Sequence, residues 1–303
     1  PFYVLDAVAA ALGIPYHKVK ILQTVTGGGF GGKEDVPALV ASHAALCAAK
    51  TGRPVKLIYG RKEDFQSMSK RHPGWARVAY AADKNGKITA CRIKYVLDGG
   101  AYSTLSPIVL WRGAVHAAGP YKIANVDIKA FAVATNKAPC GAFRGFGQPQ
   151  ICFAQESLID ELAEKIGMDP VQFRLKNLFK PGDETATGQR LNSSCGLKEL
   201  VRTVRRRSGW YKKKAEGLGL KDKVGDIVTG VGFSAAYYGV GLGAKGRCLD
   251  RAGAFVNIYK DSSVGVNVGN TEMGQGALTV LAQIAAETLN APYKNVKVEE
   301  VDS

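Results

Sequence analysis

The spacing of apolar residues in the first part of the chain predicts helices and strands on both sides of a glycine-rich loop. Residues 1–13 are rich in alanine and other apolar residues, and Gly13 stands where a glycine commonly ends a helix. A second alanine-rich stretch follows the loop and is closed by Thr51-Gly52. The expected elements are, in order, a helix at 1–13, a strand at 19–25, a glycine loop at 26–32, a helix at 34–50 and a strand at 54–59.

Two later stretches alternate apolar and polar residues with the period of a β-strand on both sides of a turn sequence. Residues 76–97 do so around Asn85-Gly86, and residues 253–268 do so around Asp261-Ser262-Ser263, so each stretch predicts a β-hairpin. Between them, an apolar helix is expected at 150–166. This mixture of hairpins and helices predicts an α+β fold.

The chain also repeats a short pattern near its two ends. An offset of 277 positions pairs Pro15 with Pro292 and aligns four further identical residues, at positions 12, 16, 19 and 20 of the first copy. Two unrelated helix-turn-strand units could share such residues by chance, but a single offset favours a duplication. We therefore expect two related mixed α/β domains.

The expected organisation is a first domain at 1–190, a basic linker region at 191–225 and the start of a second domain at 226–303. The second copy of the repeat stops where the first copy enters its glycine loop. The glycine loop that precedes the second copy would have its counterpart before Pro1. Both domains are therefore expected to be truncated, and the chain alone is expected to be inactive.

Composition describes an ordinary globular protein, with 46% hydrophobic and 22% charged residues. No apolar run approaches the length of a membrane span, and the start lacks the features of a signal peptide. The six cysteines are scattered without a C-x-x-C pair, which favours free thiols in a reducing compartment, so we expect a cytoplasmic protein. Scattered cysteines and four histidines also disfavour an iron-sulfur cluster or a structural zinc in this chain. Any metal would then be held through an organic ligand.

The densest source of the net charge of +15 lies between Arg202 and Lys223. One interpretation is a surface that binds a polyanion or an acidic partner. The other is a helix end that continues into a solvated linker, and we favour it because no nucleic-acid-binding motif accompanies the charge. Nucleic acid is therefore not an expected partner.

Three glycine-rich loops, each followed by a predicted helix, indicate a ligand-binding site. The first, at 27–34, lets the backbone approach a ligand and exposes N–H donors, although Glu34 after Lys33 excludes a P-loop. The second, at 140–150, alternates Gly and Phe around Arg144, so it offers aromatic faces and paired donors. The third is at 269–276. Each could be only a tight turn or a site of core aromatics, but three together favour one shared anionic ligand.

These loops read GGGFGGKE, AFRGFGQPQ and GNTEMGQG, and in this order they resemble the molybdopterin-binding subunit of the xanthine dehydrogenase/aldehyde oxidase family. The resemblance covers essentially the whole chain. It implies a molybdenum-pterin cofactor, alone or as its cytosine dinucleotide, that hydroxylates a carbon with oxygen from water. It also implies iron-sulfur and FAD units on partner chains or domains, in a complex that is a homo-oligomer.

The resemblance further implies roles for residues of the loops. Phe146 would stack on a flat substrate, and the metal would be held through the pterin rather than by side chains. The residues implied to contact the cofactor are Gly29, Phe30, Gly31 and Arg144 at its molybdenum end, and Gly274, Gln275 and Gly276 at its pterin or phosphate.

Glu34 and Arg112 suggest the substrate class, since in the family a carboxylate and an arginine at these places bind opposite edges of a purine. The sequence therefore predicts a purine or a similar N-heterocycle as substrate. An aldehyde or an aromatic acyl thioester is the alternative, and a non-catalytic relative without metal is another. The family's catalytic base would follow Ser303, so Glu34 is not assigned that role. Tyr237 and Tyr238 are candidates for a second aromatic contact to the substrate.

Overall fold

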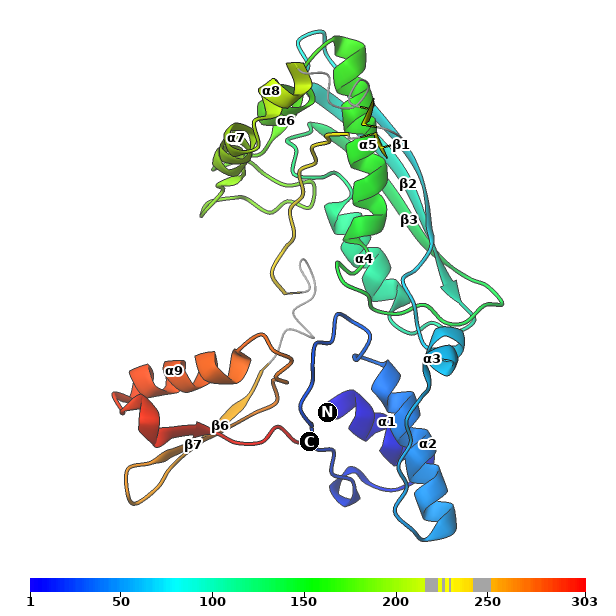
Figure 1. Ribbon diagram of the computed structural model, residues 1–303, viewed down its shortest axis with the longest axis vertical. Helices are drawn as coiled ribbons and strands as arrows, with labels where there is room; N and C mark the ends of the chain where they lie inside the picture. Colours follow the sequence, from blue (N-terminus) through cyan, green and yellow to red (C-terminus); the bar gives the residue numbers. More distant parts are fainter. Residues whose placement is uncertain (216–222, 225–226, 229, 242–251) are drawn as a thin grey trace.

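The computed structural model describes residues 1–215, 223–224, 227–228, 230–241 and 252–303 (Figure 1). Its centre is a sheet of three strands in the order β1-β2-β3: β1 Gly74–Ala82, β2 Ile88–Gly100 and β3 Asn125–Ala134. β1 and β2 are antiparallel, whereas β2 and β3 are parallel. Parallel neighbours need a crossover, which here contains helix α4 Ser106–His116.

The predicted first hairpin is confirmed, with Gly86 at a positive φ of 79° in its turn. Alternate residues of β2, Ile93, Tyr95 and Leu97, are at most 1% exposed, as expected for a strand with one buried face. They pack with residues of α4 and of α5 Gln148–Ile166, which lie together over the sheet in Figure 1. The predicted helix at 150–166 is thus confirmed, and it ends at Gly167 in the left-handed conformation.

A second core cluster lies at the other end of α5. It includes Phe173 of α6 Pro170–Asn177, Val201 of α7 Leu197–Arg207 and Trp210 of α8 Trp210–Ala215. The expected linker at 191–225 therefore contains two helices that contribute buried residues to this core, rather than a solvated connection alone. The short strands β4 Lys223–Val224 and β5 Ile227–Val228 follow in the chain. Several positions of the basic stretch, Lys221 among them, lie outside the described residues.

The N-terminal part consists of α1 Phe2–Leu12, the 3-10 turn η1 Tyr16–Lys18, α2 Val36–Thr51 and α3 Arg61–Ser67. Both long helices end in a left-handed glycine, as predicted. The strands predicted at 19–25 and 54–59 are wrong, because neither segment forms a ladder and only Leu22 makes an isolated bridge, to Asp302. Their residues suit strands, but a strand also needs a hydrogen-bonded neighbour.

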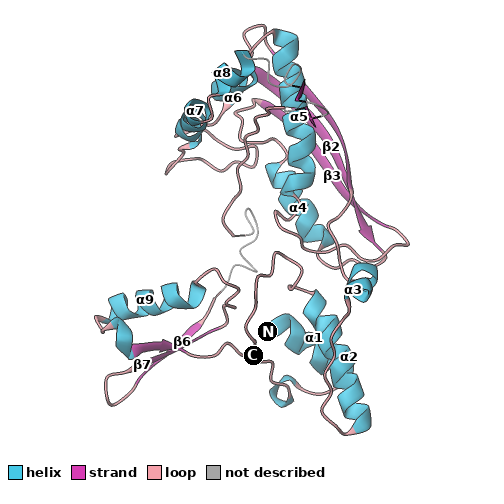
Figure 2. Cartoon of the chain, viewed as in Figure 1, coloured by secondary structure: helices cyan, strands magenta, loops and turns pink. Residues whose placement is uncertain are grey.

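The C-terminal part contains β6 Ala254–Ile258, β7 Val264–Val268, α9 Ala277–Leu289, the 3-10 turn η3 Tyr293–Asn295 and β8 Val296–Val298. Figure 2 shows the helix beside the hairpin that the sequence predicted. β8 pairs parallel with β7. In the first copy of the repeat, no described strand occupies the place of β7, which explains why residues 19–21 do not form a strand.

The helix that opens each copy of the repeat ends with the same hydrogen bond. The Ile14 N–H donates to Ala9 O at 3.1 Å, and at the offset of 277 positions Ala291 N–H donates to Ala286 O at 2.9 Å. A proline then precedes a 3-10 turn in both copies. None of the described helices combines the length and the apolar character needed to cross a membrane.

Candidate functional site

The three glycine-rich loops are far apart in the sequence, but in the structure the first loop touches both of the others. Gly28 N–H donates to Met273 O at 3.1 Å, and Arg144 N–H donates to Phe30 O at 2.9 Å. Gln23 also donates from Nε2 to Glu272 O at 2.6 Å. The first loop therefore contacts both of the others through its backbone.

Gly31 lies so close to the second loop that no side chain fits there. Its φ is 91°, and a Cβ on it would lie 2.8 Å from both the Ala142 carbonyl carbon and the Phe143 nitrogen. Phe30 beside it has a φ of 52° and is 62% exposed as a residue. The glycine thus permits a close backbone contact that presents the neighbouring ring at the surface of the loop cluster.

Arg144 is held from two sides. Its guanidinium carbon lies 5.5 Å from the centre of the Phe30 ring, and its carbonyl oxygen accepts a hydrogen bond of 2.6 Å from Arg71 Nη2. Arg71 in turn stacks on Phe143 at 4.4 Å. Phe146, at a φ of 46°, is half-buried and packs against the core cluster formed by residues of β2, α4 and α5. Only part of its ring is open to a ligand.

The third loop is organised by Glu272, which sequence reasoning missed. Its carboxylate accepts hydrogen bonds from Gly274 N–H at 2.7 Å, Gly276 N–H at 3.0 Å and Leu278 N–H at 3.2 Å. These bonds lower the pKa of Glu272, that from Gly276 most. A carboxylate of the chain therefore already occupies the positive end of α9 that was expected to attract an anionic ligand.

Gln275, which was expected to face the cofactor, folds back on its own loop. Its Oε1 accepts from Met273 N–H at 2.6 Å, and its Nε2 donates to Thr271 O at 2.8 Å. Gly274 and Gly276 have positive φ angles and open space on the side where a Cβ would stand. The assignment of these three residues to the cofactor stays a prediction.

Arg112 is the most enclosed of the predicted site residues, at 1% exposure on α4. Its helix approaches the second loop closely, because a Cβ at Gly147 would lie 2.9 Å from Gly113 N. Nη2 of Arg112 donates to Gly239 O, and the Tyr238 ring lies 4.2 Å from the guanidinium carbon. Nη1 is buried and has no hydrogen-bond partner in the described part of the chain.

His116, one turn further along α4, completes this cluster and was not predicted. It stacks on Tyr238 with ring centres 5.0 Å apart, and its Nε2 accepts from Gly239 N–H at 3.1 Å. Burial lowers the pKa of His116, which favours the neutral ring that can accept this bond. Tyr238 was a weak candidate from sequence, whereas His116 sits in no motif that could have identified it.

Glu34 is half-buried just before α2, and burial, followed by the charge of Asp35, raises its pKa. In the described residues, no hydrogen bond or ion pair joins Glu34 to Arg112. The structure therefore places the two predicted substrate residues on separate elements without direct contact. No group of three His, Cys, Asp or Glu among the described residues could hold a metal ion.

Comparison with known proteins identifies the family. Two different family models, each described as a molybdopterin cofactor-binding domain, match the chain, one at residues 1–178 and the other at residues 203–303. The chain belongs to the xanthine dehydrogenase/aldehyde oxidase family. This confirms the resemblance seen in the three loops and makes molybdopterin the cofactor of the chain.

Individual members of the family cover most of the chain. It is 36% identical over 285 residues to a probable xanthine dehydrogenase subunit of Bacillus subtilis, and this match covers 94% of it. It is 41% identical over 208 residues, or 69% of its length, to the nicotinate dehydrogenase large molybdopterin subunit of Eubacterium barkeri. Among solved structures, the aldehyde oxidoreductase of Desulfovibrio gigas matches 98% of the chain with a TM-score of 0.82 and 30% identity. The chain spans 37%, 48% and 32% of these three proteins respectively.

The first loop fits the family's cofactor on its own geometry. No hydrogen bond within the described residues uses the N–H groups of Gly29, Phe30 or Gly31. These donors lie on a glycine turn beside the Arg144 guanidinium, which suits an oxygen-rich, anionic ligand. The donor set therefore agrees with a molybdopterin held by hydrogen bonds rather than by protein ligands to the metal.

Proposed function

We propose that this chain is the cofactor-holding part of a molybdenum hydroxylase that oxidises a purine or another N-heterocycle. The observation that carries the proposal is the contact of the three loops through Phe30 and Arg144 on one side and Gly28 and Met273 on the other. Two of the relatives are named for xanthine and nicotinate, which are both nitrogen heterocycles, and this supports the substrate class.

In this proposal the glycine turn and Arg144 hold the molybdenum end of the cofactor through hydrogen bonds. Gly274 and Gly276, which have open space where a Cβ would stand, would face its pterin, and Gln275 would join them by giving up its hydrogen bonds to Met273 N–H and Thr271 O. When bound, the cofactor supplies the molybdenum at which the substrate carbon is oxidised with oxygen from water. The Glu272 carboxylate keeps the third loop in shape, because three backbone N–H groups depend on it.

The substrate is oriented by Arg112, Glu34 and Phe146. Burial strengthens the electrostatic interactions of Arg112, and its Nη1, which has no partner among the described residues, is a donor that is costly to leave unpaired. A heteroatom of the substrate ring would provide that partner and would be stabilised when negative charge develops on it. Glu34, whose pKa is raised by burial, would bind the opposite edge, and the open part of the Phe146 ring would stack on the substrate plane.

Electrons would leave through iron-sulfur and flavin partners. The relatives' names describe single subunits of larger enzymes, which supports partner chains of this kind. An aldehyde substrate is the second candidate, because aldehyde oxidoreductases are among the similar structures, at 30% and 32% identity.

The test uses the purified complex that contains this chain, assayed with xanthine, nicotinate and an aromatic aldehyde. Glu34→Gln should lower kcat/KM for the preferred heterocycle by roughly 10- to 100-fold, the loss of one hydrogen bond to a charged group. Its molybdenum content should stay normal. Lys33→Gln, at the exposed neighbouring position, is the matched control and should retain full turnover. Loss of molybdenum in Glu34→Gln, or turnover of the aldehyde alone, would contradict the substrate assignment.

A further inference from the structure

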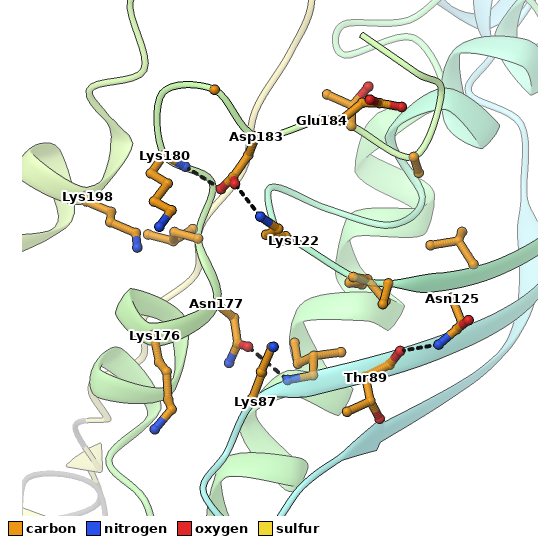
Figure 3. Close-up of a pocket in the computed structure, with 18 of the residues that line it drawn as sticks. Lys87, Thr89, Lys122, Asn125, Lys176, Asn177, Lys180, Asp183, Glu184 and Lys198 are labelled. Atoms are coloured by element: carbon orange, nitrogen blue, oxygen red, sulfur yellow. Dashed lines mark hydrogen bonds and ion pairs between the residues drawn. The ribbon is translucent and has the colours of Figure 1, made fainter. Parts of the chain in front are cut away.

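A cavity lies far from the three loops, at the opposite end of β2. It has a volume of about 980 Å³ and is lined by the start of β2, by the end of α6, by the turn at 182–186 and by Lys198 of α7 (Figure 3). The other end of β2 adjoins the second glycine-rich loop, since Cys140 N–H donates to Gly99 O at 2.9 Å. With about 3.3 Å per strand residue, the thirteen residues of β2 separate the two places by roughly 40 Å.

Positive charge dominates the lining of this cavity. One aspartate and one glutamate, Asp183 and Glu184, face a larger set of basic residues from five separate segments. In the described part of the chain only one of these basic side chains has an ion-pair partner, Lys122, which lies 2.6 Å from Asp183 Oδ1. The basic residues of the lining are Lys87, Lys122, Lys176, Lys180, Arg190 and Lys198.

The wall that carries these charges is fixed by buried hydrogen bonds. Asn177, at 3% exposure, accepts from Ile88 N–H at 2.9 Å and donates to Gly86 O at 2.8 Å. Asp183, at 4%, accepts from Lys180 N–H at 3.0 Å as well as from Lys122. The segments that bear Lys87, Lys176 and Lys180 are thereby held in place before any ligand arrives.

Like charges gathered around one cavity repel each other, so the arrangement is least stable when it is empty. A bound anion would offset that repulsion, and lysine ammonium groups are suitable contacts for phosphate oxygens. The volume is that of a small-molecule site. The six basic residues all line one hollow, although most of their side chains are exposed, and this favours a compact ligand over an acidic protein segment. We infer that this cavity binds a small polyanion with three or more negative charges, of the oligophosphate class.

The experiment is a calorimetric titration of the purified complex with tripolyphosphate. The expected result is saturable binding of one anion per chain that weakens as salt is added. A triple variant that removes three ammonium groups should bind at least about tenfold more weakly, which is the loss expected if only one of the three makes a charged hydrogen bond to the anion. A matched triple variant at exposed lysines elsewhere should bind as the parent does. The two variants are Lys87→Gln, Lys176→Gln and Lys198→Gln, and, as control, Lys50→Gln, Lys129→Gln and Lys294→Gln.

Equal weakening in both variants would show that tripolyphosphate responds only to net charge, and would overturn the inference. No binding to the parent complex would overturn it too. Loss of a partner subunit from the first variant, without tripolyphosphate binding to the parent, would assign the cavity to protein docking instead. Tripolyphosphate binding tests only the anion site, and hydroxylase turnover tests only the proposed reaction. Failure of one proposal can therefore be distinguished from failure of the other.

Discussion

Replacing Gly31 by alanine tests the contact between the first and second loops most sharply. The added methyl would stand 2.8 Å from two backbone atoms of Ala142 and Phe143, whereas ordinary contacts begin at 3.4 Å. Backbone cannot rotate away as a side chain can, so the loops must separate by about half an ångström or more. The φ of 91° adds a cost, because a residue with a Cβ avoids this region.

These contributions give the expected magnitude. The left-handed conformation costs alanine about 1–2 kcal/mol. Separation of the loops also stretches the 2.9 Å hydrogen bond from Arg144 N–H to Phe30 O, which contributes about 1 kcal/mol. The total of about 2–3 kcal/mol should lower the Tm of this part of the protein by roughly 5–10 °C. The same displacement removes the donors and the Phe30 ring from their positions, so cofactor content should fall.

Gly32→Ala is the matched control in the same loop. A Cβ at Gly32 would lie 3.7 Å from its nearest neighbour, Gly29 O, and its φ is not positive. This variant should change the free energy of unfolding by no more than about 0.5 kcal/mol and should retain its cofactor. Differential scanning calorimetry and molybdenum analysis check both variants. Equal behaviour of the two alanines would refute the contact between the loops.

Three further predictions concern charged residues. Arg174→Met should destabilise the protein by about 3–5 kcal/mol in urea unfolding, because Glu156, 2.9 Å away, would keep a buried charge without its partner; a loss below about 1 kcal/mol would contradict this. The hydrogen bond from Lys137 is the main cause that lowers the pKa of Asp98 to about 2 from its usual 3.8. The stabilisation that ionised Asp98 gives the folded protein is therefore complete above pH 3.8 and is lost as the pH falls through 2. Asp98→Asn should therefore flatten the acid-unfolding curve in that range, and an unchanged curve would exclude the pair as its cause. Glu272→Gln should speed amide hydrogen exchange in the first turn of α9, measured by mass spectrometry, and unchanged exchange would remove its assigned role.

Local pattern was sufficient for most of the fold. The hairpin turn at Gly86 and the helix end at Gly167 follow from short-range chemistry, and the structure has both. The strands expected at 19–25 and 54–59 failed because pairing depends on a neighbour that the segment itself does not encode. The burial of Val201 and Trp210 was not predicted either, because the basic residues around them suggested a segment exposed to solvent.

The candidate site was predictable only where its residues form a recognisable sequence motif. The loops around Phe30 and Arg144 stand out as glycine clusters, and their contact agrees with a shared ligand. His116 and Glu272 could not be found, because a single polar residue on a helix or before a turn has no distinguishing neighbours in sequence. Arg112 was expected to act together with Glu34, and its buried packing against residues 238–239 emerges only from the tertiary structure.

A cryo-electron microscopy map of the cofactor-loaded complex, focused on the three loops, would decide whether they bind molybdopterin together. We predict pterin density in contact with the backbone of Gly29, Phe30 and Gly31 and with the Arg144 side chain. In a map of the substrate-bound complex, we also predict the heterocyclic substrate between Arg112 and Glu34. Density for the cofactor elsewhere, with the three loops in contact only with one another, would contradict the assignment of the loops as its binding site.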